Sequence, residues 1–249
     1  MAKRSMISWC NSSWNPWTGC TKLSPGCENC YMYRAQKRFG KDPSKIIRSK
    51  TQFAAPFKWK TPSVVFVCSW SDFFHEAADQ WRPDAWLIMN ECRRHQFLIL
   101  TKRPEYIKYA LPDDWGAGYP NVWLGVTVES EQYLYRLKIL NDTPAVKRFV
   151  SYEPALEFVD FTGNISNLNW FIAGGESGPE SRPSNPNWFR FSGVTCQNNA
   201  VPFFFKQHGG NKMIDGVWGG NKLDGQVYQA VPESLNQIFE FHKKHPSCP

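Results

Sequence analysis

The sequence lacks the features that mark membrane and secreted proteins. No stretch reaches the roughly 18 consecutive apolar residues that a membrane-spanning helix needs. The N-terminal stretch MAKRSMISWC is basic but has no apolar core of the kind found in a secretion signal. The eight cysteines stand at irregular positions, which argues for reduced thiols rather than a disulfide framework. These absences predict a cytoplasmic protein without a membrane partner.

Several common catalytic motifs are missing as well. The chain contains no P-loop, no nucleophile-elbow serine and no HExxH pair. Gly174 and Gly175 are adjacent, but a glycine pair is too short to be the dinucleotide-binding fingerprint. Any chemistry of the chain must therefore be sought in a different pattern.

What the sequence does contain is positive charge and aromatic rings. Its 249 residues, 42% hydrophobic and 20% charged, suit a folded protein with one large domain or two small ones. The net charge of +7 favours polyanionic partners, nucleic acid above all, and a merely basic surface is an equally simple explanation. Most of the 12 tryptophans and 18 phenylalanines belong in a core, and some could stack on bases.

A repeated order of apolar run, polar tip and helix predicts a parallel α/β fold. The apolar runs cover residues 64–68, 97–100, 121–128, 148–151, 169–173 and 201–205. Helices are expected near 31–39, 84–94, after Pro104, at 131–140 and at 234–244. A doubly wound sheet and a β/α barrel both fit, and the polar residue at each strand tip favours the barrel.

Six such runs and one further strand near the cysteine loop are fewer than the eight of a closed barrel. The sequence therefore predicts a partial (β/α) barrel of six to seven parallel strands over residues 1–208. Residues 209–249 are rich in Gly, Asn and Asp and predict a C-terminal extension of turns and a small hairpin, packed on the barrel.

Three cysteines in one short loop are the strongest sign of a metal centre. Cys27 and Cys30 are two residues apart, and Cys20 lies seven positions upstream. A structural zinc site needs four ligands, and Cys10 could be the fourth. A three-cysteine iron–sulfur cluster leaves one iron free to bind a substrate or cofactor. Unligated thiols are the third alternative, and the spacing alone does not choose among them.

A family resemblance adds to this interpretation. The stretches WNPWTGCTKLSPGCENCY, VFVCSWSDFF, FLILTKRPE, NVWLGVTVE, FVSYEP, FIAGGESG and PFFFKQHG resemble, in this order, a phage-associated protein family with a three-cysteine N-terminal motif. That family resembles a divergent branch of the radical S-adenosylmethionine (SAM) superfamily. The spacing departs from the usual motif, because six residues rather than three separate Cys20 from Cys27. Asn29 stands where an aromatic residue is usual, and Tyr31 follows the last cysteine.

The resemblance implies a radical SAM enzyme. Cys20, Cys27 and Cys30 would hold a 4Fe-4S cluster whose free iron binds SAM, and reduction would give a 5′-deoxyadenosyl radical. An electron donor such as flavodoxin or ferredoxin is then implied. Repair or modification of a nucleic acid or nucleotide would suit the basic charge. The alternatives are a nucleic-acid-binding protein with structural zinc and a barrel that keeps the cluster but acts through a protein partner.

The resemblance and the strand tips together nominate the other site residues. The predicted cofactor-binding residues are Tyr31, Ser69, Ser71, Asp72, Thr127, Glu129, Glu153, Gly174, Gly175 and Glu176. The predicted catalytic residues are Cys68, Tyr152 and Lys102, and Lys102 with Arg103 and Lys206 would make the barrel mouth basic. Each has an ordinary structural alternative: helix capping for the serines and Asp72, salt bridges for the glutamates, tight turns for the glycines and core packing for Cys68.

Overall fold

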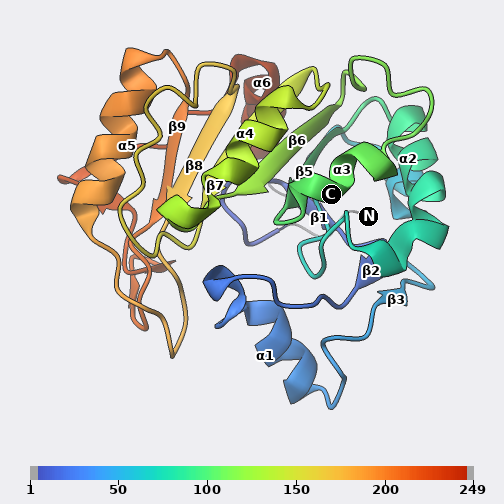
Figure 1. Cartoon of the computed structure of the whole chain (residues 1–249), viewed down its shortest axis with the longest axis horizontal. Helices are drawn as coiled ribbons and strands as arrows, with labels where there is room; N and C mark the ends of the chain where they lie inside the picture. The colour runs from blue at the N-terminus through green and yellow to red at the C-terminus, as the bar shows by residue number, and fades with distance from the viewer. Residues whose placement is uncertain (1–4, 246–249) are drawn as a thin grey trace.

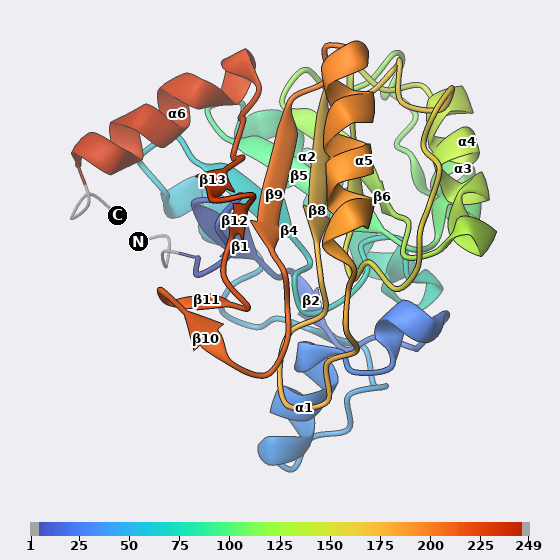
Figure 2. The same cartoon turned by 90° about the vertical axis from the view of Figure 1, so that its left-hand side faces the viewer.

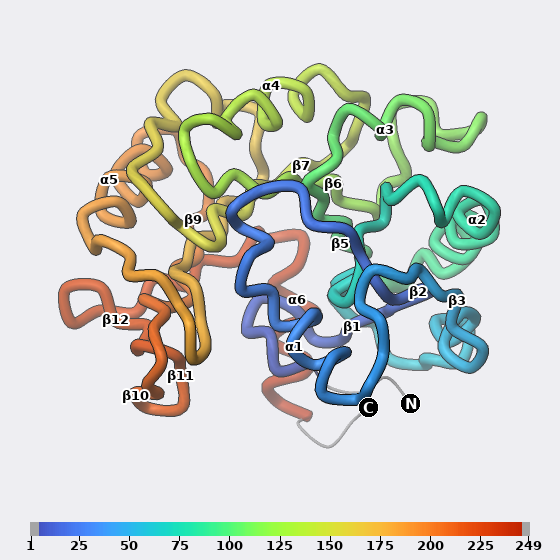
Figure 3. Tube along the Cα trace, turned by 60° about the horizontal axis from the view of Figure 1, so that its bottom comes forward, coloured from blue at the N-terminus to red at the C-terminus, as the bar shows by residue number. Residues whose placement is uncertain are grey.

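Seven parallel strands form the framework of the computed structural model, which describes residues 5–245 (Figure 1). In order across the sheet they are β1 (Ser12–Trp14), β4 (Val64–Val67), β5 (Gln96–Thr101), β6 (Val122–Thr127), β7 (Lys147–Tyr152), β8 (Trp170–Gly174) and β9 (Phe203–Gln207). The spatial order follows the chain order without a reversal, which excludes the doubly wound sheet. The sheet curves but does not close (Figure 3), so the predicted partial barrel is confirmed.

Helices cover the convex face of this half-barrel (Figure 3). They are α2 (Arg82–Glu91), α3 (Pro104–Ala110), α4 (Tyr135–Asp142) and α5 (Pro186–Asn198), and each joins two neighbouring strands. Proline stands in the first turn of α2, α3 and α5, where its missing N–H costs no hydrogen bond. Between β7 and β8 a loop replaces the helix.

Side chains alternate between the two faces of the sheet, and both faces are buried. Val65 and Val67 join the core under the helices, whereas Val64 and Phe66 join a second core on the concave face. Burial on both sides explains why the strands appear in the sequence as unbroken apolar runs.

Aromatic rings and the last helix fill the concave face. Trp9, Trp123 and Phe149 pack there, and Leu235 of α6 (Glu233–Lys244) is buried against them. Gly125 must lack a side chain because a Cβ at that position would lie 2.4 Å from the Phe149 ring.

The segment after β9 forms two small hairpins (Figure 2). These pair β10 (Met213–Ile214) with β11 (Val217–Trp218), and β12 (Lys222–Leu223) with β13 (Gln226–Val227). The backbone N–H of Phe205 in β9 donates to the Tyr228 carbonyl at 2.6 Å, so the segment lies against the sheet edge. No helix in residues 5–245 has the length and apolarity to span a bilayer.

His95 should make folding stability sensitive to acid. Its ring is fully buried, edge-on to Trp59 and Phe97, and burial lowers its pKa to about 4. The unfolded chain therefore binds more protons than the native protein between pH 6.5 and 4, and stability falls as the pH falls through that range. The loss at pH 4 is expected to reach about 3 kcal/mol.

Urea unfolding at pH 7 and pH 4 tests this expectation. The stability advantage of the wild type over His95→Asn should shrink as the pH falls. Only the wild type has a buried neutral imidazole, and protonation of that ring at low pH favours the unfolded chain. The same substitution at exposed His245 serves as the control. An advantage that is equal at both pH values would contradict the assignment.

Candidate active site

A cavity of about 250 Å³ lies at the carboxyl ends of the strands. Residues at or directly after five strand ends line it: Cys68, Lys102, Thr127, Glu153 and Gly175. Parallel strands bring their carboxyl ends to one edge, which is where barrel enzymes place their active sites. The cysteine loop and α1 (Tyr31–Arg38) cross this same end (Figure 3).

All three loop cysteines line this cavity. Cys20, Cys27 and Cys30 are partly buried free thiols. Burial raises the pKa of Cys20 to about 12, so a metal that binds its thiolate must displace a proton. Cys10, the fourth ligand in the zinc hypothesis, is buried elsewhere, in the core of the concave face.

The thiols share a cavity without meeting at one point. Within residues 5–245, no three His, Cys, Asp or Glu side chains converge on a position for a single metal ion. In a 4Fe-4S cluster the thiolates bind different irons, so its ligands need not converge on one point. The donor set of three free thiols around one cavity therefore fits such a cluster.

Close backbone packing fixes the start of the cysteine loop. Gly19 has a φ of +96°, and a Cβ there would lie 2.1 Å from the Lys45 carbonyl oxygen. The Ser71 hydroxyl donates to the Gly19 carbonyl at 2.5 Å, and the Tyr33 hydroxyl donates to the carbonyl of Cys20. These contacts place Cys20 beside the tip of β4.

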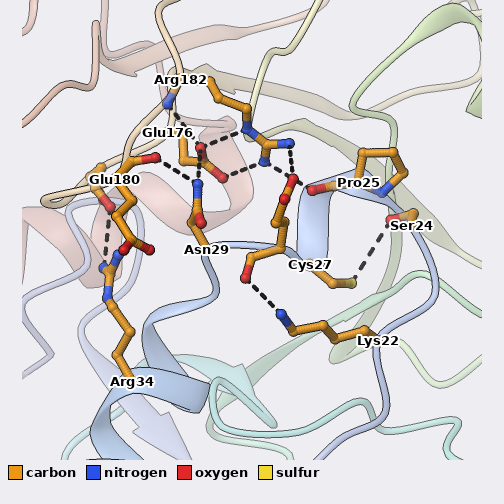
Figure 4. Close-up of polar contacts among 11 residues, drawn as sticks. Lys22, Ser24, Pro25, Cys27, Asn29, Arg34, Glu176, Glu180 and Arg182 are labelled. Atoms are coloured by element: carbon orange, nitrogen blue, oxygen red, sulfur yellow. Dashed lines mark hydrogen bonds and ion pairs between the residues drawn. The ribbon is translucent and has the colours of Figure 1, made fainter.

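Arg182, in the segment between β8 and α5, holds the part of the cysteine loop that runs from Pro25 to Asn29 (Figure 4). Arg182 donates to both carboxylate oxygens of Glu176, from Nε at 2.9 Å and from Nη2 at 2.5 Å. The same guanidinium reaches Glu28 Oε2 at 3.0 Å and the Pro25 carbonyl at 2.9 Å, and Asn29 Nδ2 donates to Glu176 at 3.0 Å. We call these five residues the loop clamp.

The loop clamp includes Glu176, which the sequence predicts to bind the cofactor. Burial opposes ionisation of Glu176, yet hydrogen bonds from Arg182 and Asn29 hold its pKa below the usual value. Its carboxylate lines the cavity while it orients the segment that carries Cys27 and Cys30.

Asp72 and the two predicted serines also have structural partners. The Asp72 carboxylate accepts from Thr101 Oγ1 at 2.7 Å, from the N–H of Lys102 at 3.0 Å and from the N–H of Phe74 at 3.0 Å, and so joins the tips of β4 and β5. Ser69 exchanges hydrogen bonds with Asn15, and Ser71 holds the cysteine loop. All three side chains nevertheless line the cavity.

The cavity lining also includes the charged side chains of Glu153, Lys206 and Lys102. Glu153 pairs with Lys206 at 2.9 Å and accepts from the Ser151 hydroxyl at 3.2 Å. Lys102 lines the cavity and forms no ion pair within residues 5–245. Asp72, which likewise forms no ion pair within residues 5–245, lines the same space, so this part of the cavity carries charges of both signs.

Glu129 lies behind the cysteine loop rather than in the cavity lining. It is fully buried and pairs with Arg136 of α4 at 2.8 Å. Its carboxyl group packs against Gly26, where a Cβ would lie 3.1 Å from Oε1, and that oxygen has no hydrogen-bond partner within residues 5–245. Thr127, two residues earlier, does line the cavity.

Comparison with known proteins gives one family. The family model described as "Protein of unknown function (DUF5131)" matches residues 4–232. The chain belongs to this family. The predicted resemblance to one protein family over most of the chain is thereby confirmed, whereas phage association and radical SAM membership stay predictions.

One solved structure is similar to this DUF5131 chain. It is described as a spore photoproduct lyase mutant with bound AdoMet and dinucleoside spore photoproduct. The sequence identity is 11%, the TM-score is 0.49, and the match covers 98% of this chain and 75% of that chain. The comparison with curated proteins gave no match.

In this DUF5131 protein Tyr152, a predicted catalytic residue, does not line the cavity. The side chain points to the helix layer, between Phe161 and Phe189, and its hydroxyl donates to the Glu157 carbonyl. Its neighbours Ser151 and Glu153 line the cavity, and alternation along a strand forces Tyr152 to the opposite face. The structure therefore does not place Tyr152 where a catalytic group must be.

The glycine pair of the DUF5131 chain serves close backbone packing. At Gly175 a Cβ would lie 1.9 Å from the His208 carbonyl oxygen, so only glycine lets the tips of β8 and β9 approach. Gly174 lies against Glu153 and is outside the cavity lining. Cys68 and Tyr31 do line the cavity: Cys68 is buried, and the Tyr31 hydroxyl donates to the Ser69 carbonyl.

Sequence reasoning missed several residues of the site. Arg182 and Asn29 position the loop, and Trp9 lines the cavity with an indole N–H that has no partner within residues 5–245. Trp9 looks like any core aromatic in the sequence. Arg182 follows Glu176 by six residues in an irregular loop, a spacing that signals no contact.

Proposed function

We propose that this protein is a radical SAM-type enzyme whose 4Fe-4S cluster is held by Cys20, Cys27 and Cys30. One observation carries the proposal: three free thiols from one loop line a single cavity at the carboxyl end of a parallel half-barrel. When bound, such a cluster supplies the electron that splits SAM into methionine and a 5′-deoxyadenosyl radical.

The chain's own residues would hold and shield the cluster. The loop clamp fixes the Cys27–Cys30 segment to the tip of β8. Ser71 joins Gly19 to the tip of β4, and Tyr33 joins Cys20 to α1. The aromatic core beneath the cavity, with Trp9 and Phe66 at its top, excludes water from below. A reactive radical requires this kind of enclosure.

The cavity also offers groups that suit the carboxylate and the ammonium group at the methionine end of SAM. Lys102 has no ion-pair partner within residues 5–245 and could accept a carboxylate. Glu153 is partly exposed, and beyond Lys206 and Ser151 its carboxylate has further lone pairs that could accept from an ammonium or a ribose hydroxyl. Ser69, Thr127 and Ser151 add hydroxyl groups around the same space.

Reductive cleavage of SAM tests the proposal directly. The anaerobic, reconstituted protein is mixed with dithionite and SAM, and 5′-deoxyadenosine is measured by chromatography. We expect release that depends on protein, dithionite and SAM together. Cys196→Ala, which removes a buried thiol of α5 outside the cavity, should release as much as the wild type. Absence of 5′-deoxyadenosine from a protein with a full cluster would overturn the proposed reaction.

A further inference from the structure

A second hollow, of about 730 Å³, adjoins the cavity that Cys20, Cys27 and Cys30 line, which we call the cysteine cavity. It lies where the half-barrel does not close, and Ser13 and Trp14 of edge strand β1 and Lys206 of edge strand β9 line it. Figure 2 views the molecule from the side of β9, with β11 beside that strand and α1 below it. Tyr31, Ser69 and Lys206 line both spaces, so the hollow leads from the surface into the cavity. We call this second hollow the edge groove.

The edge groove is positively charged. Arg34 and Lys206 line it, and the described lining includes no Asp or Glu. Lys206 is paired with Glu153 of the adjoining cavity at 2.9 Å, so Arg34 is the cation of this lining that has no ion pair within residues 5–245. Arg34 makes one hydrogen bond, to the Ser177 carbonyl at 3.3 Å, while its Nη1 is buried without a partner within residues 5–245. Gly178, with a φ of +112°, packs so closely that a Cβ would lie 2.5 Å from Arg34 Nη2. The backbone therefore holds an unpaired guanidinium in place, which is a prepared site for an anion.

Aromatic side chains with exposed ring surface line the edge groove together with Arg34. Tyr31 is 47% exposed, and Trp70 and Trp218 are partly exposed. Neither tryptophan packs against another aromatic ring in the part of the chain that the structure describes. Cations that contact phosphates, next to aromatic faces on which bases stack, are typical of single-stranded nucleic-acid sites.

We propose that the edge groove binds a short single-stranded segment of nucleic acid and directs one base into the cysteine cavity. Arg34 contacts a phosphate, Lys206 stands where the groove meets the cavity, and Trp70, next to Ser69 at the same junction, stacks on a base. The volume suits one or two nucleotides rather than a duplex, since small-molecule pockets measure about 300–1,000 Å³. As an assignment of the substrate this inference rests on the function proposed above, whereas the binding site itself does not.

Binding of labelled decanucleotides tests the inference on the full-length protein. Fluorescence anisotropy is recorded over a range of salt concentrations with single-stranded DNA, single-stranded RNA of the same sequence and the corresponding DNA duplex. Arg34→Gln removes one cation from the groove, and Trp70→Ala removes one stacking surface. Lys138→Gln on exposed α4 and Tyr109→Ala on exposed α3 remove the same kinds of group elsewhere.

The two groove variants should differ in a way that simple misfolding cannot reproduce. Arg34→Gln should weaken binding and lower the slope of log affinity against log salt by about 0.7, the value for one phosphate contact on a single strand. Trp70→Ala should weaken binding about tenfold and leave that slope unchanged, because stacking releases no counterion. Both controls should bind as the wild type does. The single strand that binds more tightly, DNA or RNA, shows whether the groove prefers deoxyribose or ribose.

Three results would overturn the groove. They are failure of the wild type to bind either single strand, preference for the duplex, and equal losses in the groove and control variants. The proposed function fails separately. If the protein binds the strand through Arg34 and Trp70 but releases no 5′-deoxyadenosine, the proposed groove stands and the proposed radical SAM reaction is overturned.

Discussion

Cys27→Ala is expected to lose the iron–sulfur cluster and to reduce 5′-deoxyadenosine release at least about 100-fold. Cys27 is one of only three thiols that line the cavity from the loop, and a cluster with one open iron needs all three. Two thiolates would leave a second iron without a protein ligand. Iron and sulfide analysis after anaerobic reconstitution, together with the visible absorption of the protein, measures the loss.

The control for this prediction is a cysteine that the cavity does not contain. Cys92→Ala removes a buried thiol at the end of α2 and should retain cluster and colour. Circular dichroism should show that Cys27→Ala remains folded, because the thiol packs in no hydrophobic core cluster. A Cys27→Ala protein that keeps about four irons would contradict the assigned ligands.

Arg136→Met should destabilise the native protein by about 3–5 kcal/mol, the usual cost of leaving a buried charge without its partner. Both side chains of the Arg136–Glu129 pair are nearly inaccessible, at 2% and 0% exposure, and their nitrogen and oxygen lie 2.8 Å apart. Arg136 also donates to the Thr127 carbonyl at 3.0 Å. The change in the free energy of unfolding is obtained from urea titrations.

A double variant separates the lost charge pair from lost packing. In Glu129→Gln/Arg136→Met the uncompensated carboxylate is gone, so most of the lost stability should return. Removal of the surface pair by Arg190→Met should cost no more than about 1 kcal/mol, because Arg190 and Asp224 are both exposed. A single Arg136→Met variant as stable as the wild type would show that the pair does not hold α4 to the tip of β6.

The half-barrel could be predicted because its strands carry a strong local signal. Val64–Val67 and Val122–Thr127 are buried on both faces and therefore appear as unbroken apolar runs with a polar residue after them. The cysteine loop was recognisable for a similar reason, since three thiols within eleven residues stand out in any sequence. Both signals are local, and neither depends on how distant segments meet.

The roles of the strand-tip residues were harder to predict because they depend on facing direction and on distant loops. Residues 151 and 153 of the stretch FVSYEP line the cavity, so Tyr152 between them must face the helices. Alternation along the strand shows that Tyr152 and Glu153 do not share a face, but not which of them faces the site. The contact between Glu176 and Arg182 depends on the path of an irregular loop, which no periodicity encodes.

Metal and sulfide analysis of the wild-type protein, purified without oxygen, tests the central claim most directly. Iron, acid-labile sulfide and zinc are measured on the same sample. A cluster held by Cys20, Cys27 and Cys30 predicts about four irons and four sulfides per chain and no stoichiometric zinc. One zinc per chain without sulfide would contradict the account and would make the three cysteines a structural metal site.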